Sequence, residues 1–217
     1  HMLRRGRHGA AVLIPTSLLR NSAFLQGLVR VVFVFSGIPG FFLVLSVYLQ
    51  SGLGLTPLQS GLATAAFPVG VMVASMNAAR LGDWPLSGRI GLGTGALATG
   101  LALTALVLWQ AGAGIASWHL TAPLLICGLG MGTVVVALFQ SVMATAPAAE
   151  SGAASGAVQA FQQIGAALGI AIVGSVYFGF LTTAAPLLAL MAACIYPFTL
   201  FTLLGLGSLL NHRKETA

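Results

Sequence analysis

The chain has 217 residues, of which 58% are hydrophobic and only 6% are charged. A soluble globular domain carries roughly 25% charged residues, so this composition excludes a protein with a water-facing surface on all sides. The formal net charge of +6 comes from nine Lys and Arg against three Asp and Glu. These basic residues flank long apolar runs, which is a pattern of membrane topology, and we expect no nucleic-acid partner.

Six apolar segments are each long enough to cross roughly 30 Å of hydrocarbon as a helix, which takes about 20 residues. The sequence therefore predicts an all-α membrane protein, a six-helix bundle whose surroundings are the lipid bilayer. We expect residues 1–21 to be a basic cytoplasmic segment with His1 as a cloning remnant, residues 22–211 to be the bundle, and residues 212–217 to be a cytoplasmic tail. The predicted spans are Ser22 to Gln50, Pro57 to Ala79, Arg89 to Gln110, His119 to Ala144, Ser151 to Phe180 and Ala185 to Leu210.

Local signals mark some helix ends and bends. Thr56 and Gln59 have capping-box spacing, with Pro57 at the first helical position, so the second helix is expected to begin there. Prolines inside a span remove a backbone hydrogen bond and predict a kink. Four prolines fall within the predicted spans: Pro39, Pro68, Pro123 and Pro197.

The basic residues also predict the orientation of the chain. Cytoplasmic loops carry an excess of Lys and Arg. The connections 51–56, 111–118 and 181–184 carry none. Both termini are therefore expected in the cytoplasm, with the bundle in the cell (inner or plasma) membrane. With six spans, eight basic residues fall on the cytoplasmic side: Arg4, Arg5, Arg7, Arg20, Arg80, Arg89, Arg213 and Lys214.

An internal repeat of three spans is also indicated. The segment Gln59 to Ala65 resembles Glu150 to Gly156, ninety-one residues later, and each opens the second helix of a three-helix set. With three spans per copy, the second copy enters the membrane from the opposite face. This predicts two inverted three-helix repeats, a plan that many transporters share.

The stretch from Leu18 to Ala79 resembles the helices that open the C-terminal half of fourteen-helix drug:proton antiporters of the major facilitator superfamily. Tyr48-Leu49-Gln50 and the run from Gly54 to Gly61 carry the resemblance most strongly, while Ala149 to Gly156 and Gln162 to Gly169 are similar to the fifth helix of that half. The resemblance implies half of a proton-coupled multidrug or small-molecule efflux transporter. It also implies a hydrophobic or cationic small molecule as substrate and a second six-helix bundle, either an N-terminal half or a homodimer partner.

One loop resembles the superfamily's cytoplasmic gating loop, in which glycine, aspartate and arginine control how neighbouring helices slide. The matching residues are Arg80, Asp83, Gly88 and Arg89. This copy departs from the family pattern, because Trp84 stands where a basic residue is usual and two extra residues separate the aspartate from the glycine. The gating role that the resemblance implies is weakened by those departures.

Arg30 is the charged residue predicted inside a span, about two turns from the cytoplasmic end of the first helix. A charge at membrane depth indicates function by default, here contact with an anionic substrate group or with an acid on another half. Alternatively, the side chain snorkels to the interface along its long stem. The sequence leaves both interpretations open.

The fifth span carries a polar face. Ser155, Gln159 and Gln162 follow i, i+4, i+7 spacing, with Gln163 beside them, so they are candidates to line a substrate cavity. Alternatively, these side chains form hydrogen bonds to neighbouring helices, and each such bond stabilises the bundle by about 1 kcal/mol.

Two glycine pairs in the same span have the small-xxx-small spacing that lets helices approach closely. The pairs are Gly152 with Gly156 and Gly165 with Gly169, and we expect all four to be packing positions.

Little in the sequence indicates an enzyme. Intramembrane aspartyl proteolysis needs two aspartates and the chain has one, and no Gly-x-Ser-Gly, His-Glu-x-x-His or nucleotide-binding motif occurs. Cys127 and Cys194 alone cannot provide the four ligands of a usual metal site. We therefore predict no enzyme activity, no cofactor and no metal, and transport driven by a gradient. The alternative class is a membrane protein that binds a partner protein or lipid without moving a solute.

Overall fold

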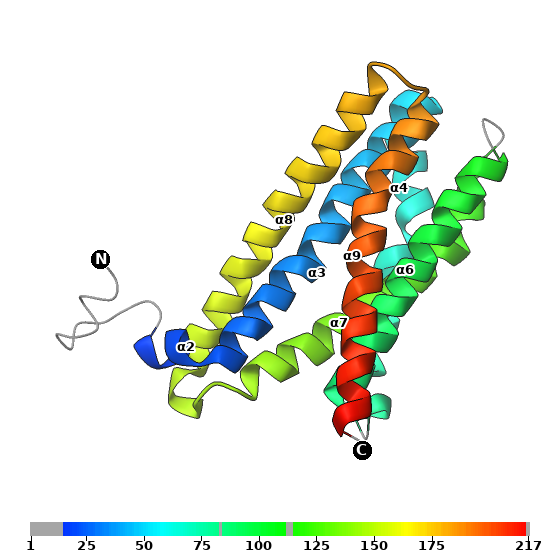
Figure 1. Ribbon diagram of the computed structural model, residues 1–217. Helices are drawn as coiled ribbons and strands as arrows, with labels where there is room; N and C mark the ends of the chain where they lie inside the picture. Colours follow the sequence, from blue (N-terminus) through cyan, green and yellow to red (C-terminus); the bar gives the residue numbers. More distant parts are fainter. Residues whose placement is uncertain (1–14, 83, 112–114, 216–217) are drawn as a thin grey trace.

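The structure, a computed structural model, describes residues 15–82, 84–111 and 115–215 (Figure 1). These residues form helices and turns and contain no strand. In chain order the elements are α2 (Thr16–Arg20), α3 (Ser22–Val47), a π-helical turn η1 (Tyr48–Gly52), α4 (Pro57–Thr64), α5 (Ala66–Met76), η2 (Ala78–Leu81), α6 (Leu86–Ala111), η4 (Ser117–Leu120), α7 (Thr121–Met143), η5 (Ala148–Glu150), α8 (Ser151–Leu181) and α9 (Pro186–Glu215).

Six helical stretches among the described residues are long and apolar enough to cross a membrane, which confirms the predicted all-α six-span fold. The last helix runs on to Glu215, past the bundle end expected at residue 211. The short helix α2 lies in the predicted N-terminal segment, and its Leu18 is fully buried against the bundle. The spans are Ser22–Gly52, Pro57–Met76, Leu86–Gln110, Trp118–Met143, Ala148–Leu181 and Pro186–Leu209.

The second span begins at the predicted capping box. The Gln59 N–H donates to the Thr56 hydroxyl at 3.3 Å, and the Thr56 N–H donates to Gln59 Oε1 at 2.9 Å. Two N–H groups that a helix start leaves without partners are thereby satisfied. Just before the cap, Gly54 has φ of +70°, a conformation that glycine adopts without strain.

The same span is divided where Pro68 predicted a kink. Pro68 lacks the N–H that would bond to the carbonyl of Thr64, four residues earlier, and its ring crowds that carbonyl. The helix accordingly ends at Thr64 and resumes at Ala66. Pro39 and Pro197 lie inside the unbroken helices α3 and α9. Pro123 lies in the first turn of α7, where a missing N–H costs nothing.

The packing of the helices has the symmetry of an inverted repeat. The first set is α3, α4–α5 and α6, and the second set is α7, α8 and α9. The first helix of each set packs against the second helix of the other, so α3 lies on α8 and α7 lies on α5. The third helices, α6 and α9, pack on each other. Figure 1 shows α3 and α8 side by side along most of their length, with α9 beside them and crossing in front of α7. The structure therefore has the two inverted three-helix repeats that the sequence predicted.

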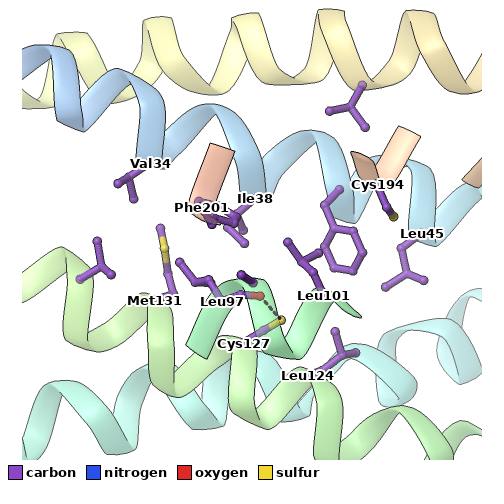
Figure 2. Close-up of a cluster of buried hydrophobic side chains, with 14 of the residues drawn as sticks. Val34, Ile38, Leu45, Leu97, Leu101, Leu124, Cys127, Met131, Cys194 and Phe201 are labelled. Atoms are coloured by element: carbon purple, nitrogen blue, oxygen red, sulfur yellow. Dashed lines mark hydrogen bonds between the residues drawn. The ribbon is translucent and has the colours of Figure 1, made fainter. Parts of the chain in front are cut away.

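The core is a continuous apolar cluster between α3, α6, α7 and α9. Figure 2 shows Ile38, Leu97 and Phe201 converging at its centre. The Cys127 thiol points to the carbonyl oxygen of Leu97 at 3.7 Å, and both Cys127 and Cys194 are free thiols. Side chains of the described residues fill the middle of the bundle and leave no solute path between them.

The basic residues gather at one end of the bundle, which we call the basic end. Arg20 at the close of α2, Arg80 in η2 and Arg89 in the first turn of α6 all lie there. The helix connections at the other end, which we call the opposite end, carry no Lys or Arg. The bundle is therefore polarised in the way that the positive-inside pattern requires.

Candidate substrate-facing surface and loop

The amide side chains of α8 point away from the other helices. Gln159 and Gln163 are exposed and Gln162 is half-buried. Among the described residues none of the three amides makes a hydrogen bond, whereas the Ser155 hydroxyl donates to the carbonyl of Gly152 at 3.0 Å. The alternative of hydrogen bonding between helices is thus not realised within this bundle. A polar face without partners is left on the outside of α8.

The two glycine pairs of α8 differ in their surroundings. A Cβ added at Gly165 would lie 2.6 Å from the carbonyl oxygen of Val32, and one added at Gly169 would overlap the carbonyl oxygen of Ser36. This pair lies against the backbone of α3. Gly152 and Gly156 are exposed, with no heavy atom within 4 Å of an added Cβ. Close packing at Gly152 and Gly156 therefore stays a prediction that needs a partner outside these residues.

Arg30 lies half-buried on α3, near an exposed apolar stripe that includes Leu25, Val29 and Phe33. Among the described residues it makes no hydrogen bond or ion pair. A long side chain beside apolar, exposed neighbours has the freedom to extend to the membrane surface. The snorkelling interpretation is favoured, and Arg30 lies apart from the amide face of α8.

Among the described residues Arg89 is the deeply buried arginine, with 3% of its surface exposed. Its Nη1 donates to Gln140 Oε1 on α7 at 3.0 Å, and its Nη2 donates to the carbonyl oxygen of Ala78 at 3.5 Å. These partners are neutral oxygens, and Nε has no hydrogen-bond partner in the part of the chain that the structure describes. Arg89 thus joins α6, α7 and the turn η2 at the basic end, a role that its place at the edge of the predicted third span did not reveal.

The rest of the predicted gating loop is spread out. Arg80 is exposed in η2, and Gly88 is buried in the first turn of α6 beside Arg89. Asp83 lies outside the described residues.

The contact between Arg89 and Gln140 had only a weak signal in the sequence, because a single amide near the end of α7 has no pattern around it.

A second contact at the basic end was also not predicted. The Ser17 hydroxyl of α2 lies 2.6 and 2.7 Å from the two carboxylate oxygens of Glu150, at the start of α8. The Asn21 side chain donates to the carbonyl of Thr145 at 2.9 Å and caps α3 through Ala23 and Phe24. The chain that leads into α3 is therefore fastened to the connection between α7 and α8.

The helix pair α4–α5 is the least buried span. Only 17% of its most apolar 18-residue window is buried, against 56% for α3. Its exposed large hydrophobic residues recur at a helical period and form one stripe, which we call the α4–α5 stripe: Leu58, Leu62, Val69, Met72, Val73 and Met76.

Six spans in two inverted repeats, with a polar face on α8 and an open stripe on α4–α5, define half of a transporter-type bundle. The chain belongs to the Major Facilitator Superfamily, whose pattern matches residues 3–170.

Curated relatives agree with this assignment. A "Probable actinorhodin transporter" of Streptomyces coelicolor is 37% identical over 184 residues, covering 83% of this chain and 32% of the relative. A "Tetracenomycin C resistance and export protein" of Streptomyces glaucescens is 33% identical over 75% of this chain and 30% of its own length. The "Multidrug efflux pump LfrA" of Mycolicibacterium smegmatis is 25% identical over 82% of this chain and 35% of the pump. The chain thus spans about a third of the length of these relatives.

Proposed function

We propose that this chain is one half of a secondary active transporter that exports small molecules, with a second six-helix bundle completing the transport path. The observation that carries the proposal is the amide face of α8. Gln159, Gln162 and Gln163 have no hydrogen-bond partner among the described residues. Amides are costly in hydrocarbon, so such a face belongs against a water-filled cavity or another protein surface.

The relatives support efflux as the direction and drug-like molecules as the substrate class. Two of the names refer to export or efflux, of tetracenomycin C and of multiple drugs, and the third refers to transport of actinorhodin. A hydrophobic or cationic small molecule suits a surface of amides and apolar side chains, because the amides supply hydrogen bonds and the apolar residues supply area. These names favour a transporter over a membrane protein that only binds a partner.

The second bundle is supported by the surfaces that remain open. The α4–α5 stripe is apolar, and no described residue packs on Gly152 or Gly156 of α8. Small residues at four-residue spacing let a neighbouring helix approach closely. The relatives' greater length leaves ample sequence for such a bundle. Substrate would pass between the two bundles as they rock about a site near mid-membrane.

Coupling to a proton gradient would then depend on an acid in the second bundle. In the described part of the chain, Glu150 is at the basic end and is held by Ser17. No Asp or Glu of this chain falls within the apolar stretches at mid-membrane depth. In the proposed orientation the basic end faces the cytoplasm, and both Arg89 and the α2 contact lie on that side.

The test is transport in liposomes with an imposed proton gradient and a fluorescent cationic dye. The chain alone would be compared, at low and high protein density, with a chimera in which this chain replaces the matching segment of the Streptomyces coelicolor relative. We expect gradient-dependent dye accumulation by the chimera and none by the chain at low density. Accumulation by isolated chains would refute the need for a second bundle.

The amide face has its own control within the chimera. Gln159→Leu with Gln163→Leu should reduce dye accumulation several-fold, whereas Gln110→Leu, at the end of α6, should leave it unchanged. A chimera that inserts normally and moves no dye, or that ignores the α8 substitutions, would contradict the proposed role of this surface.

A further inference from the structure

A groove opens between α6 and α9 in the half of the bundle nearest the opposite end. Its volume is about 410 Å³, and it is lined by Leu101, Ala102, Ala105, Leu106 and Trp109 of α6 and by Met191, Cys194, Ile195 and Phe198 of α9. None of these residues belongs to the amide face of α8 or to the α4–α5 stripe. The groove is therefore separate from the proposed transport surface.

The groove exists because the two helices separate along their length. At the basic end they touch closely: a Cβ on Gly91 would lie 3.2 Å from Leu209, and one on Gly205 would lie 3.1 Å from the Thr94 hydroxyl. Toward the opposite end Figure 1 shows α6 and α9 diverging. There Ala102 and Ala105, three residues apart on α6, leave space that larger side chains would fill.

The lining has a buried floor and exposed walls. Leu101 and Cys194 form the floor, with 1% and 8% of their surfaces exposed. Leu106, Ile195 and Phe198 form walls that are between 40% and 62% exposed. Apart from a thiol and the indole of Trp109, the lining offers no hydrogen-bonding side chain. An occupant with amide or charged groups would leave those groups without partners.

We propose that this groove holds one acyl chain of a membrane phospholipid, lying lengthwise between α6 and α9. Both walls are membrane spans, so the groove opens into hydrocarbon. Along α6 it extends from Leu101 to Trp109, or about 12 Å at a rise of about 1.5 Å per residue, close to the roughly 15 Å depth of one leaflet.

Trp109 supports this placement of the lipid. It lies one residue before the end of the third span, at Gln110, and is 61% exposed. Tryptophan favours the level of the lipid headgroups, so the mouth of the groove is at the level where an acyl chain begins. A transmembrane helix, from a second bundle or a second copy, would need a face of about 30 Å, and this groove spans less than half of that depth.

The test uses the full chain in liposomes containing a phosphatidylcholine with a diazirine in its acyl chain. After irradiation, mass spectrometry locates the lipid adducts. We expect adducts on the floor residue Cys194 as well as on Leu203, which is exposed on the same helix and measures ordinary lipid contact. Only an acyl chain inside the groove reaches the thiol of Cys194.

Substitutions then fill or widen the groove. Ala102→Phe should reduce the adduct at Cys194 several-fold and leave the adduct at Leu203 unchanged. Ala171→Phe, the same change at an exposed position of α8, should alter neither adduct, and Ile195→Ala should preserve or increase the adduct at Cys194.

Three results would overturn the proposal: no lipid adduct at Cys194; an adduct there that Ala102→Phe does not reduce; or capture of that thiol instead by a diazirine derivative of a cationic dye. The first two would show that no acyl chain lies in the groove, and the last would assign the groove to a drug.

Discussion

The contact between α3 and α8 depends on glycine at position 169, and replacing it with alanine tests the packing directly. An added Cβ would overlap the carbonyl oxygen of Ser36 and lie 2.5 and 2.8 Å from its C and Cα atoms. These are backbone atoms inside a helix, so they cannot rotate away. Restoring an ordinary contact distance of about 3.5 Å between the added Cβ and these atoms requires α3 and α8 to separate by more than about 1 Å.

That separation weakens the whole interface, because Gly40 and Gly165 lie at the same contact. Overpacking of a close-packed site costs about 1–3 kcal/mol, and a backbone obstacle favours the upper part of that range. Alanine is more favourable than glycine in a helix by about 0.5–1 kcal/mol, and this gain offsets part of the cost of overpacking. We therefore expect Gly169→Ala to lower the free energy of unfolding by about 1–2 kcal/mol.

Gly156→Ala is the matched control, because it is the same substitution in the same helix with no heavy atom within 4 Å. It should raise the free energy of unfolding by up to about 1 kcal/mol. In a Cys194→Ala background, thermal unfolding in detergent can be followed with a thiol-reactive dye, since the remaining buried Cys127 reacts only after opening. Each kcal/mol shifts the midpoint by about 2–4 °C. Equal midpoints for the two variants would refute the close approach of α3 and α8.

Three further predictions concern the basic end and the topology. Gln140→Ala should lower the free energy of unfolding by about 1–3 kcal/mol, because it removes an acceptor from a buried charged donor. A double-mutant cycle with Arg89→Met should show a coupling energy of at least about 0.5 kcal/mol, and additive effects would contradict the contact. Arg30→Leu should change the free energy of unfolding by no more than about 0.5 kcal/mol, and a larger loss would reveal a buried partner. In a cysteine-free chain, cysteines at Ala79 and Thr183 should label from opposite sides of the membrane, with Ala79 labelled from the cytoplasm; labelling from one side would exclude the six-span arrangement.

Span formation was predictable because it depends on local quantities. A helix in hydrocarbon satisfies its backbone hydrogen bonds internally, so length and apolar composition are sufficient to locate it. The capping box at Thr56 and the interruption four residues before Pro68 are equally local, since each involves atoms within one turn. The inverted repeat was also foreseeable, because an odd number of spans per copy reverses the second copy.

The faces that the helices turn toward one another were decided by the tertiary structure. The pairs Gly152/Gly156 and Gly165/Gly169 have identical spacing, yet only the second pair meets another helix. Arg30 lies well within its helix but stays half-buried, whereas Arg89, at the edge of its predicted span, is buried and hydrogen-bonded to α7.

The sequence by itself determined how many helices cross the membrane, where they begin and the class of protein that they form. The tertiary structure decided which side chains are left for a substrate, a second bundle or a lipid. Spacing along one helix defines a face, but the occupant of that face depends on helices distant in the sequence. The groove between α6 and α9 is a case of this kind, because Ala102 and Ala105 leave a hollow only where α9 diverges.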